Sequence, residues 1–579
     1  MLSTPQPATG SGSEAAAGAG HPVFPGLNSG KPPRILLAGV FGPYGVDDAF
    51  GRRENLMELF HNQVTKAQGL ASLRFHHRSF GLYFLAENVD ADVTVLDFPS
   101  RRRFVRELRQ DYDIVGISFI APNFLKAQEM ARLVREHSPR SVILLGGHGA
   151  AIEGIERLVA CDHVVRGEGI RWLQRYLGQD TGAPIRHPRM PANDYHRVFG
   201  VPIPGTTGGL LVPGVGCDNG CRFCCTTHFF GKTYQPFISS GKELFDTACR
   251  MADRDGYDTF FIQDENFLKQ RERAMEMLAE MRRTGRWFKF HVFASADTVT
   301  AWGAEALARL GVHLLWIGFE SKTGPVFTKN VGIDQEALVA DLRRHGISVL
   351  ASAILCMEHH TPQTLREDID HMIGLQADMV QFMLLTGLPV TGVYRDHKEQ
   401  QLIRTGLPYE EWHGQKELNY AHPAFPGSAP AEWLERAFRE EYERNSSSIY
   451  RLIRTALCGY RTLSAKGAGD AELRVRAGQL YDRIQEYRPL LPTIARYAVN
   501  ALERERAVAL EREVATLLGP PTAKQRFYAL AVRAFAACWA LRVTCLGDRV
   551  QPRTRVTRYR AREAPAADRC RTARPGHGP

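Results

Sequence analysis

Short apolar runs alternate with amphipathic stretches through the first third of the chain. Five such runs occur, at residues 34–39, 93–97, 114–118, 142–146 and 163–165. Short continuous apolar runs are typical of buried parallel strands, and the stretches between them have helical periodicity. The pattern predicts a doubly wound, Rossmann-like α/β domain over residues 31–180, with its ligands at the carboxyl ends of the strands.

The alternation resumes after a segment without any periodic pattern. Residues 181–206 are rich in proline and glycine, and we interpret them as an interdomain linker. Six further apolar runs follow, at 209–215, 259–263, 289–294, 313–318, 348–355 and 379–386. Six strand–helix units in series predict a barrel or partial (β/α)6 barrel over residues 207–425. Strands then disappear, and residues 426–547 are expected to form a helical domain.

Composition narrows the class of protein. Of the 579 residues, 44% are apolar, 23% charged and 9% aromatic, which is ordinary for a globular protein and excludes collagen, a coiled coil and wholesale disorder. Residues 1–30 lack the basic and apolar regions of a secretory signal and are expected to be a disordered leader. No uninterrupted apolar run is long enough to span a bilayer, so we expect a cytoplasmic protein.

The net charge of +10 comes mostly from one end of the chain. Residues 549–579 hold nine arginines against Glu563 and Asp568, a local charge of +7 that leaves +3 for the rest. A basic tail such as residues 548–579 can bind RNA or anionic lipid, but solvated disorder is the simpler interpretation. The rest of the chain has no basic stripe with interleaved aromatics, so we expect no nucleic-acid partner.

Four of the eleven cysteines lie within nine residues. Cys217, Cys221 and Cys224 form the pattern C-x3-C-x2-C directly after the first predicted barrel strand, and Cys225 follows. Three thiolates on one short loop can bind three irons of a 4Fe–4S cluster and leave the fourth iron open. A structural zinc site is the alternative, but it needs four ligands, and the adjacent Cys224 and Cys225 cannot easily face one ion. We therefore predict an iron–sulfur cluster on the first three cysteines.

This motif resembles that of the radical S-adenosylmethionine enzymes, in which three cysteines at this spacing open a barrel of βα units. Phe223, an aromatic residue just before the third cysteine, is a further point of resemblance. The resemblance implies that the open iron chelates S-adenosylmethionine, which an electron from the cluster cleaves to methionine and a 5′-deoxyadenosyl radical. It also implies an external electron donor such as flavodoxin or ferredoxin. Cys225 is then a packing residue.

Further positions match that family in part. Asp264 and Glu265 follow the second barrel strand, where the family has a Gly-Gly-Glu-like element for the amino group of S-adenosylmethionine. Glu320 and Ser321 end the fourth strand, where the family contacts ribose or carboxylate. Helix N-capping is the alternative role for Asp264 and Glu320. Residues 353–356 depart from the family's Ile-x-Gly, whereas residues 385–394 resemble the stretch that closes the barrel in its cobalamin-linked branch.

The order of the two α/β domains resembles that of the cobalamin-dependent branch of this family. The matching positions at the N-terminal strand ends are Ser118, Gly146, Gly147, His148, Gly167 and Glu168. In that branch such elements line the channel for the nucleotide tail of cobalamin, and glycines allow the close approach of a flat ligand. A dinucleotide-binding fold is disfavoured, because residues 39–42 do not form G-x-G-x-x-G.

The Asp-x-His-x-x-Gly element, which supplies a cobalt-binding histidine in other cobalamin proteins, is missing from this chain. His76 and His77 lie nearby in sequence but have the wrong spacing. His148 is the next candidate for a cobalt ligand, but a histidine within a glycine-rich turn more often hydrogen-bonds the backbone or the corrin amides. We therefore expect no histidine on the lower face of the corrin.

In this branch the common reaction is C-methylation of an unactivated carbon. One S-adenosylmethionine methylates cobalamin, a second supplies the radical that abstracts a substrate hydrogen, and the substrate radical takes the methyl group. The branch also contains ring-forming and oxidative members without methyl transfer, such as a porphyrin cyclase, which are the alternative. A noncatalytic cobalamin sensor would need no cysteine cluster. We expect a small-molecule substrate, such as a lipid or a secondary-metabolite precursor.

Residues 527–546 are apolar on nearly all sides. Their only charges, Arg533 and Arg542, lie about 180° apart around a helix axis. Such a helix is either buried or rests against an apolar partner. Packing within the C-terminal domain is the preferred interpretation, and peripheral contact with a membrane, assisted by the basic tail, is the alternative.

Overall fold

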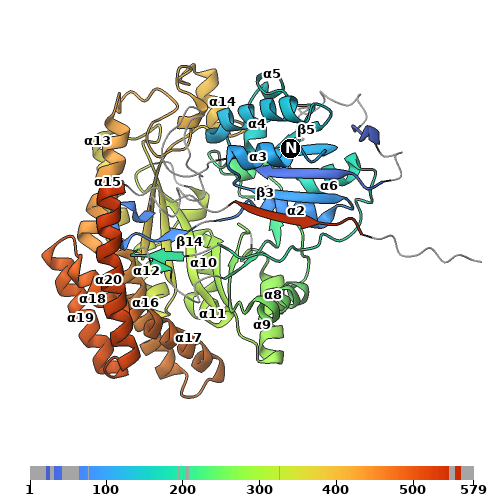
Figure 1. Cartoon of the computed structure of the whole chain (residues 1–579). Coiled ribbons are helices and arrows are strands. Elements are labelled where there is room, and N and C mark those ends of the chain that lie inside the picture. Colours follow the sequence, from blue (N-terminus) through green and yellow to red (C-terminus); the bar gives the residue numbers. More distant parts are fainter. Residues whose placement is uncertain are drawn as a thin grey trace, which may run out of the picture.

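The computed structural model describes residues 21–26, 31–41, 64–75, 77–193, 196–199, 201–202, 208–265, 267–324, 327–546 and 554–562. Figure 1 shows an N-terminal α/β domain, a central barrel and a group of C-terminal helices that covers one side of the barrel. His76 and most of the leader and tail lie outside the described residues.

The N-terminal sheet is doubly wound, as predicted. Its strands lie in the order β17-β3-β1-β4-β5-β6, and every pairing is parallel except that of β17 with β3. The N-terminal strands are β1 (Arg34–Gly39), β3 (Asp92–Asp97), β4 (Ile114–Ser118), β5 (Val142–Gly146) and β6 (His163–Val164). Most side chains of the central strands are buried on both faces, which explains why they form continuous apolar runs.

Helices cover both faces of this sheet. On one face lie α2 (Phe80–Asn88) and α6 (Gly169–Tyr176), and on the other α3 (Arg101–Leu108), α4 (Phe124–His137) and α5 (Ile155–Leu158), with the 3-10 turns η2 (Gly69–Ala71), η3 (Ala121–Asn123) and η4 (His148–Ala151) between elements. Side-chain caps set where two helices begin. The Ser100 hydroxyl accepts from the Arg103 N–H at 3.1 Å, and the Glu168 carboxylate accepts from the Arg171 N–H at 2.9 Å.

The central part is an open barrel of six parallel strands, again as predicted. The strand order β16-β15-β14-β13-β12-β9 follows the chain, and β9 and β16 stay unpaired with each other among the described strands. The barrel strands are β9 (Gly209–Leu211), β12 (Thr259–Ile262), β13 (Lys289–Ala294), β14 (Val312–Glu320), β15 (Ser348–Leu355) and β16 (Met379–Leu384). A short antiparallel pair, β10 (Gly214–Val215) and β11 (Gln235–Pro236), follows β9.

The helices that connect the barrel strands follow from local sequence signals. They are α7 (Cys225–Phe229), α8 (Gly241–Asp255), α9 (Arg271–Thr284), α10 (Ala296–Trp302), α11 (Ala304–Leu310), α12 (Gln335–Arg344), α13 (Pro362–Gly374) and α14 (Gly392–Glu399), with η5 (Thr328–Asn330) and η6 (Tyr409–Glu411). In α8, Ser240 caps the first turn and Gly256, with φ of +73°, ends the last one. The sharp stop at Gly256 leaves a short loop to β12.

Two buried arginines tie the C-terminal helices to the barrel. The helices are α15 (Ala429–Asn445), α16 (Ser448–Lys466), α17 (Ala471–Tyr487), α18 (Leu491–Arg496), α19 (Ala501–Leu518) and α20 (Ala523–Leu546), with η7 (Arg488–Leu490). Arg451 pairs with Glu441 and donates to the carbonyl of Ala377 at 2.7 Å. Arg476 donates to the carbonyls of Phe288 and Arg309, both at 2.8 Å. The helical domain is therefore fixed to barrel loops by polar as well as apolar contacts.

Two segments that we expected to be irregular are partly ordered. In the leader, Phe24 is buried and its N–H donates to the carbonyl of Tyr176 at 2.8 Å. In the linker, β7 (His196–Val198) and β8 (Val201–Pro202) join β2 (Arg74–Phe75) in a three-stranded sheet. Strands of two or three residues are too short to produce a periodic pattern, so the sequence did not indicate them.

The expectation of a disordered tail is wrong for residues 554–562. Residues 555–559 form β17 (Arg555–Tyr559), which pairs antiparallel with β3 at the edge of the N-terminal sheet. The guanidinium of Arg558 lies 2.8 Å from the carboxylate of Glu107 and 2.9 Å from the hydroxyl of Thr94. Valine, threonine and tyrosine alternate here with the arginines, and this strand-forming composition was hidden within the basic run.

The helix α20 is the one helix in the described part of the chain that is long and apolar enough to cross a membrane. Packing within the C-terminal domain is the wrong interpretation for most of it, because only Val532 and Ala536 are buried. Figure 1 shows α20 along the outside of the helical group. The helix therefore presents apolar side chains away from the protein.

A chain that ends at Arg553 should be less stable than one that ends at Arg562, because only the shorter chain lacks β17. The lost pairing with β3 and the lost contacts of Arg558 remove several hydrogen bonds, each worth about 1 kcal/mol. We expect the Tm of the shorter chain to be lower by about 4–8 °C, as measured by circular dichroism. Equal melting of the two chains would show that β17 does not stabilise the sheet.

Candidate functional site

A cavity of about 870 Å³ lies where the carboxyl ends of the two sets of parallel strands face each other. The N-terminal sheet contributes the ends of β4 and β5, and the barrel contributes residues of β9 and β12 to β16. This volume is in the range of sites for small ligands and cofactors. We call this space the central cavity.

The cysteine loop opens into the central cavity. Cys217, Cys221 and Cys224 lie between β10 and α7, and all three line the cavity. The loop turns sharply because Gly216 and Gly220 have φ of +85° and +68°. Burial raises the pKa of Cys217 and Cys221, and the neighbouring thiols add to the rise. Three thiols this close favour a bound cation over three separate thiolates, so the donor set fits an iron–sulfur cluster.

Cys225 differs from its three neighbours. It is the first residue of α7 and also lines the cavity, but burial raises the pKa of its thiol to about 12. A thiol with this pKa stays protonated at neutral pH when no metal is bound. The packing role of Cys225 stays a prediction from its position after the motif.

Two carboxylates and a lysine line the cavity as well. Glu320, at the end of β14, pairs with Lys329 at 2.6 Å. Burial acts to lower the pKa of Lys329, but the adjacent Glu320 carboxylate raises it overall. Burial raises the pKa of Glu265 to about 7. A lysine and a carboxylate near one another suit the carboxylate and amino groups of an amino-acid ligand such as S-adenosylmethionine.

Two of the predicted contact residues do not line the cavity. Asp264 is fully buried, pairs with Arg273 at 3.0 Å and accepts from the hydroxyl of Tyr234 at 2.6 Å. Ser321 lies beside His359, with 3.4 Å between its hydroxyl and Nε2. Helix capping is also the wrong role for Asp264, because Gln270 occupies the N-cap of α9. The structure thus places Asp264 in a buried polar network with Arg273 and Tyr234, outside the lining of the cavity.

Glycines form a cradle on the N-terminal side of the cavity. Ser118, Gly146, Gly147 and Gly167 line it. A Cβ at Gly146 would meet nothing within 4 Å, whereas a Cβ at Gly147 would lie 2.5 Å from the carbonyl oxygen of Phe119. Backbone without side chains lets a bulky flat ligand approach closely, as the nucleotide tail of cobalamin requires. Glu168 also lines the cavity, but its carboxylate is used as the cap of α6.

His148 lies in the turn after Gly147 and is half-buried, with its ring against Phe229 and Phe230 of the cysteine side. Its ring centroid is 4.6 Å from that of Phe229 in α7. Burial lowers its pKa to about 4, so the imidazole is neutral, and its Nε2 has no hydrogen-bond partner among the described residues. These features support a role as a hydrogen-bonding group for a ligand in the cavity. His77, by contrast, bonds the carbonyl of Ala192 at 2.8 Å.

A polar chain across the barrel interior was missed from the sequence. Trp316 Nε1 donates to the hydroxyl of Ser352 at 2.6 Å, and this hydroxyl donates to Gln381 Oε1 at 3.0 Å. All three line the cavity, and Gln381 Nε2 is buried with no hydrogen-bond partner in the part described. The sequence feature that could have predicted Ser352 and Gln381 is that each is a polar residue within an otherwise apolar parallel strand. Phe223, which was predicted, also lines the cavity.

One group of potential metal ligands lies outside the cavity. His359, His360 and Asp368 come close enough to share an ion. Asp368 already accepts from the N–H groups of Lys322 and Thr323, at 3.0 and 2.9 Å, and bonds His360 at 3.0 Å. Because these atoms are paired, the group supports the loops after β14 and β15.

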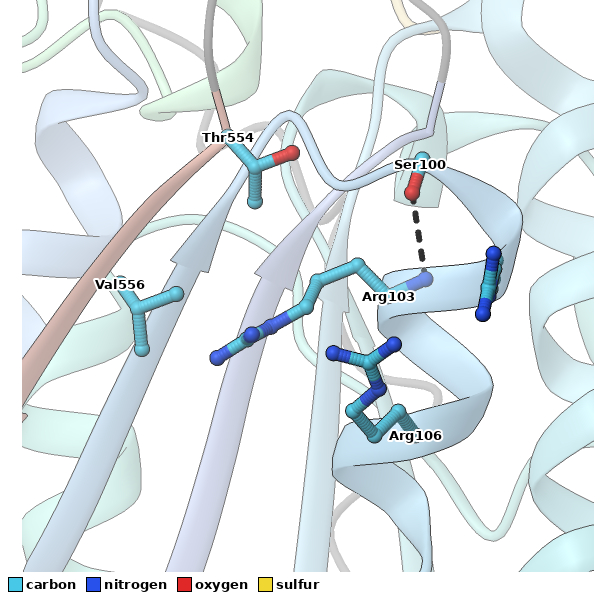
Figure 2. A pocket seen from close by; sticks show the side chains of 6 residues that line it. Ser100, Arg103, Arg106, Thr554 and Val556 are labelled. Atoms are coloured by element: carbon cyan, nitrogen blue, oxygen red, sulfur yellow. Dashed lines mark hydrogen bonds between the residues drawn. The ribbon is translucent and has the colours of Figure 1, made fainter.

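A second, smaller hollow lies at the edge of the N-terminal sheet. Figure 2 shows Arg103 and Arg106 of α3 on one side of it and Thr554 and Val556 on the other, with the Ser100 hydroxyl bonded to the backbone of α3. None of its lining residues also lines the central cavity. This hollow therefore holds none of the described residues that were predicted to contact a cofactor.

Comparison with known proteins agrees with this layout. A family model described as B12 binding domain matches residues 69–175. An uncharacterized methyltransferase of Pyrococcus horikoshii is 22% identical over 56% of this chain and 79% of its own length. Bacteriochlorophyllide d C-12(1)-methyltransferase of Chlorobaculum tepidum is 23% identical over 56% of this chain and 74% of its own. The radical S-adenosylmethionine methyltransferase TsrM from Kitasatospora setae, solved with cobalamin and a 4Fe–4S cluster, matches 79% of this chain and 99% of that chain at 16% identity and a TM-score of 0.48.

The B12-binding match covers the domain that carries the glycine cradle, and the three-cysteine loop opens the barrel beside it. Residues 69–175 match the B12-binding family, and the chain is similar to methyltransferases over 56% of its length. The B12-binding match agrees with the predicted cobalamin, and the 4Fe–4S cluster and S-adenosylmethionine stay predictions from the cysteine motif. The assignment of individual contact residues stays a prediction.

Replacing Cys217, Cys221 and Cys224 by alanine should abolish the cluster. The wild-type enzyme, reconstituted without oxygen, should hold about four irons and four sulfides and absorb light at about 400 nm. The triple variant should lose both, whereas Cys225→Ala should keep them, because Cys225 lies outside the C-x3-C-x2-C pattern. An unchanged absorption band in the triple variant would overturn the ligand assignment.

A bulky side chain at Gly146 should block cobalamin. Gly146 faces open space, so Gly146→Trp should fold normally yet fill the cradle. We expect at least tenfold weaker binding in a titration with hydroxocobalamin. Gly406→Trp is the matched control, since a Cβ there also meets nothing within 4 Å and Gly406 lies outside the cavity. Equal affinity of the two variants would contradict the proposed cradle.

Proposed function

We propose that this enzyme methylates an unactivated carbon of a small-molecule substrate. The observation that carries the proposal is that one cavity is lined by the cysteine loop, the Glu320–Lys329 pair and the glycine cradle. A reaction that uses a cluster, S-adenosylmethionine and cobalamin on one substrate needs all of them within reach of one space. Ring formation without methyl transfer is the alternative.

Different residues of the chain bind the different cofactors. When bound, the cluster supplies the electron that cleaves S-adenosylmethionine, and cobalamin carries the methyl group. Cys217, Cys221 and Cys224 hold the cluster. Lys329 binds the carboxylate of S-adenosylmethionine, and Glu265 binds its amino group. Because the pKa of Glu265 is about 7, an ammonium partner would keep this carboxyl charged in the loaded enzyme.

The barrel interior supports an apolar substrate with at least one hydrogen-bond acceptor. Phe261, Phe293 and Trp316 line the cavity in a row, with successive ring centroids 5.3 and 5.0 Å apart. Beside them, the Nε2 of Gln381 is a hydrogen-bond donor with no partner among the described residues. We therefore favour a lipid or a secondary-metabolite precursor as the substrate class. Apolar walls also exclude water, which protects a radical from side reactions.

Electrons would enter at the cysteine loop. The side chains of Asp218 and Arg222, which flank the cluster cysteines, are 55% and 53% exposed. An external donor such as flavodoxin or ferredoxin can therefore approach the loop. We place the enzyme in the cytoplasm, with peripheral contact to a membrane through α20.

Labelled S-adenosylmethionine tests the proposed reaction. The loaded enzyme is incubated with methyl-deuterated S-adenosylmethionine and extracts of the producing organism. We expect label in a new carbon-bound methyl group, with S-adenosylhomocysteine and 5′-deoxyadenosine formed in equal amounts. These products are measured by mass spectrometry, and the triple cysteine variant is the control.

The same experiment distinguishes the alternative. 5′-Deoxyadenosine formed with substrate, but without S-adenosylhomocysteine or transferred label, would contradict methyl transfer. That outcome would favour ring formation or oxidation in the same cavity.

A further inference from the structure

Large exposed apolar side chains concentrate on α20. Among the described residues thirteen such side chains are exposed, and five of them belong to this helix: Phe527, Leu530, Phe535, Leu541 and Leu546. Their exposed fractions run from 45% to 74%. Apolar area gathered on one element of a water-soluble protein usually marks an interaction site.

Three of these five side chains form a strip along the helix, and Phe535 and Leu546 lie outside it. At about 100° per residue, Phe527, Leu530 and Leu541 fall within about 60° of one another. The buried Val532 and Ala536, which face the protein, lie on the opposite side of the helix. The strip therefore points directly away from the body of the enzyme.

Cations border the strip on both sides. Arg533 and Arg542 each lie about 90° from the centre of the strip, one on either flank. The helix also carries Lys524 and Arg526 near its start, and it contains no aspartate or glutamate. An apolar strip between two cationic edges matches a lipid surface, where the strip enters the acyl region and the long side chains reach the headgroups.

The ends of α20 decide how it can meet a bilayer. At 1.5 Å per residue the helix is about 36 Å long, enough to cross the hydrocarbon core. Its start is held by Gln525, which bonds Gln485 at 2.7 Å, and only residues 547–553 separate its end from Thr554 beside β17. Seven extended residues reach about 25 Å, less than the core thickness. Both ends must stay on the same side, so the helix cannot span.

We infer that α20 lies in the plane of an anionic membrane surface and holds the enzyme there reversibly. A second copy of the chain is a poorer occupant, because pairing two such strips would bring cations against cations with no acidic partner on either helix. An anionic lipid surface offers both the apolar depth and the negative charge. The contact is independent of the proposed methyl transfer, since it needs neither substrate nor turnover.

Vesicle flotation with the full-length, cofactor-loaded enzyme tests the inference. One set of vesicles is pure phosphatidylcholine, and the other contains phosphatidylcholine and phosphatidylglycerol at about three to one. We expect the enzyme to float with the anionic vesicles at low salt and to be released from them by added salt. With pure phosphatidylcholine vesicles it should stay in the bottom fraction of the gradient.

Paired variants distinguish the effect of losing the apolar strip from the effect of a changed net charge. Phe527→Glu with Leu541→Glu removes the strip, and we expect at least tenfold weaker partitioning. Leu502→Glu with Leu517→Glu, on exposed positions of α19, carries the same charge change and should float like the wild type. Arg533→Gln with Arg542→Gln should weaken partitioning about 30-fold. Melting curves should be unchanged, because these side chains are exposed.

Three outcomes would overturn the inference. The first is a wild-type enzyme that does not float with anionic vesicles. The second is equal flotation of the Phe527→Glu, Leu541→Glu variant and the wild type. The third is a wild-type dimer, detected by analytical ultracentrifugation, that these two substitutions split while vesicles bind neither form, since the strip would then be an interface between copies.

Discussion

The structure depends on one geometric constraint: two sets of parallel strands must end at the same space. In each α/β domain the carboxyl ends of the strands are the places where loops can carry ligands. Here β4 and β5 present their ends to the open mouth of the barrel, and the central cavity lies between them. The cysteine loop occupies the start of the barrel, so it faces the glycine cradle across that space. The candidate cofactor contacts that line the cavity follow from this placement.

Much of the fold could be predicted because parallel strands in covered sheets are apolar throughout. The segments 34–39, 114–118, 142–146, 289–294 and 348–355 match their observed strands residue for residue. The failures have two causes. The elements β2, β7 and β8 are too short for periodicity, and β17 combines strand-forming residues with a run of arginines. Burial of α20 could not be judged from its composition, because an apolar helix has the same sequence whether protein or lipid covers it.

The site was predictable where a motif defines spacing and less so where tertiary contacts decide. The cysteine motif and the glycines of β5 line the cavity as expected, because both lie in short loops at strand ends. Asp264 has the right sequence position, yet Arg273 and Tyr234 draw it into a buried network. Lys329 was overlooked because its partner Glu320 lies on another element, at the end of β14. Such pairings arise only when the chain folds.

The pairing of β17 with β3 also constrains the order of assembly. Arg555 lies opposite Asp97, so the edge of the cobalamin-binding sheet is completed by a strand more than four hundred residues further along the chain. During synthesis the N-terminal domain emerges first and must wait, with one edge unpaired, until the barrel and the C-terminal helices have been made. A strand made after the barrel and the C-terminal helices therefore closes the first domain, so the complete N-terminal sheet can form only late in synthesis.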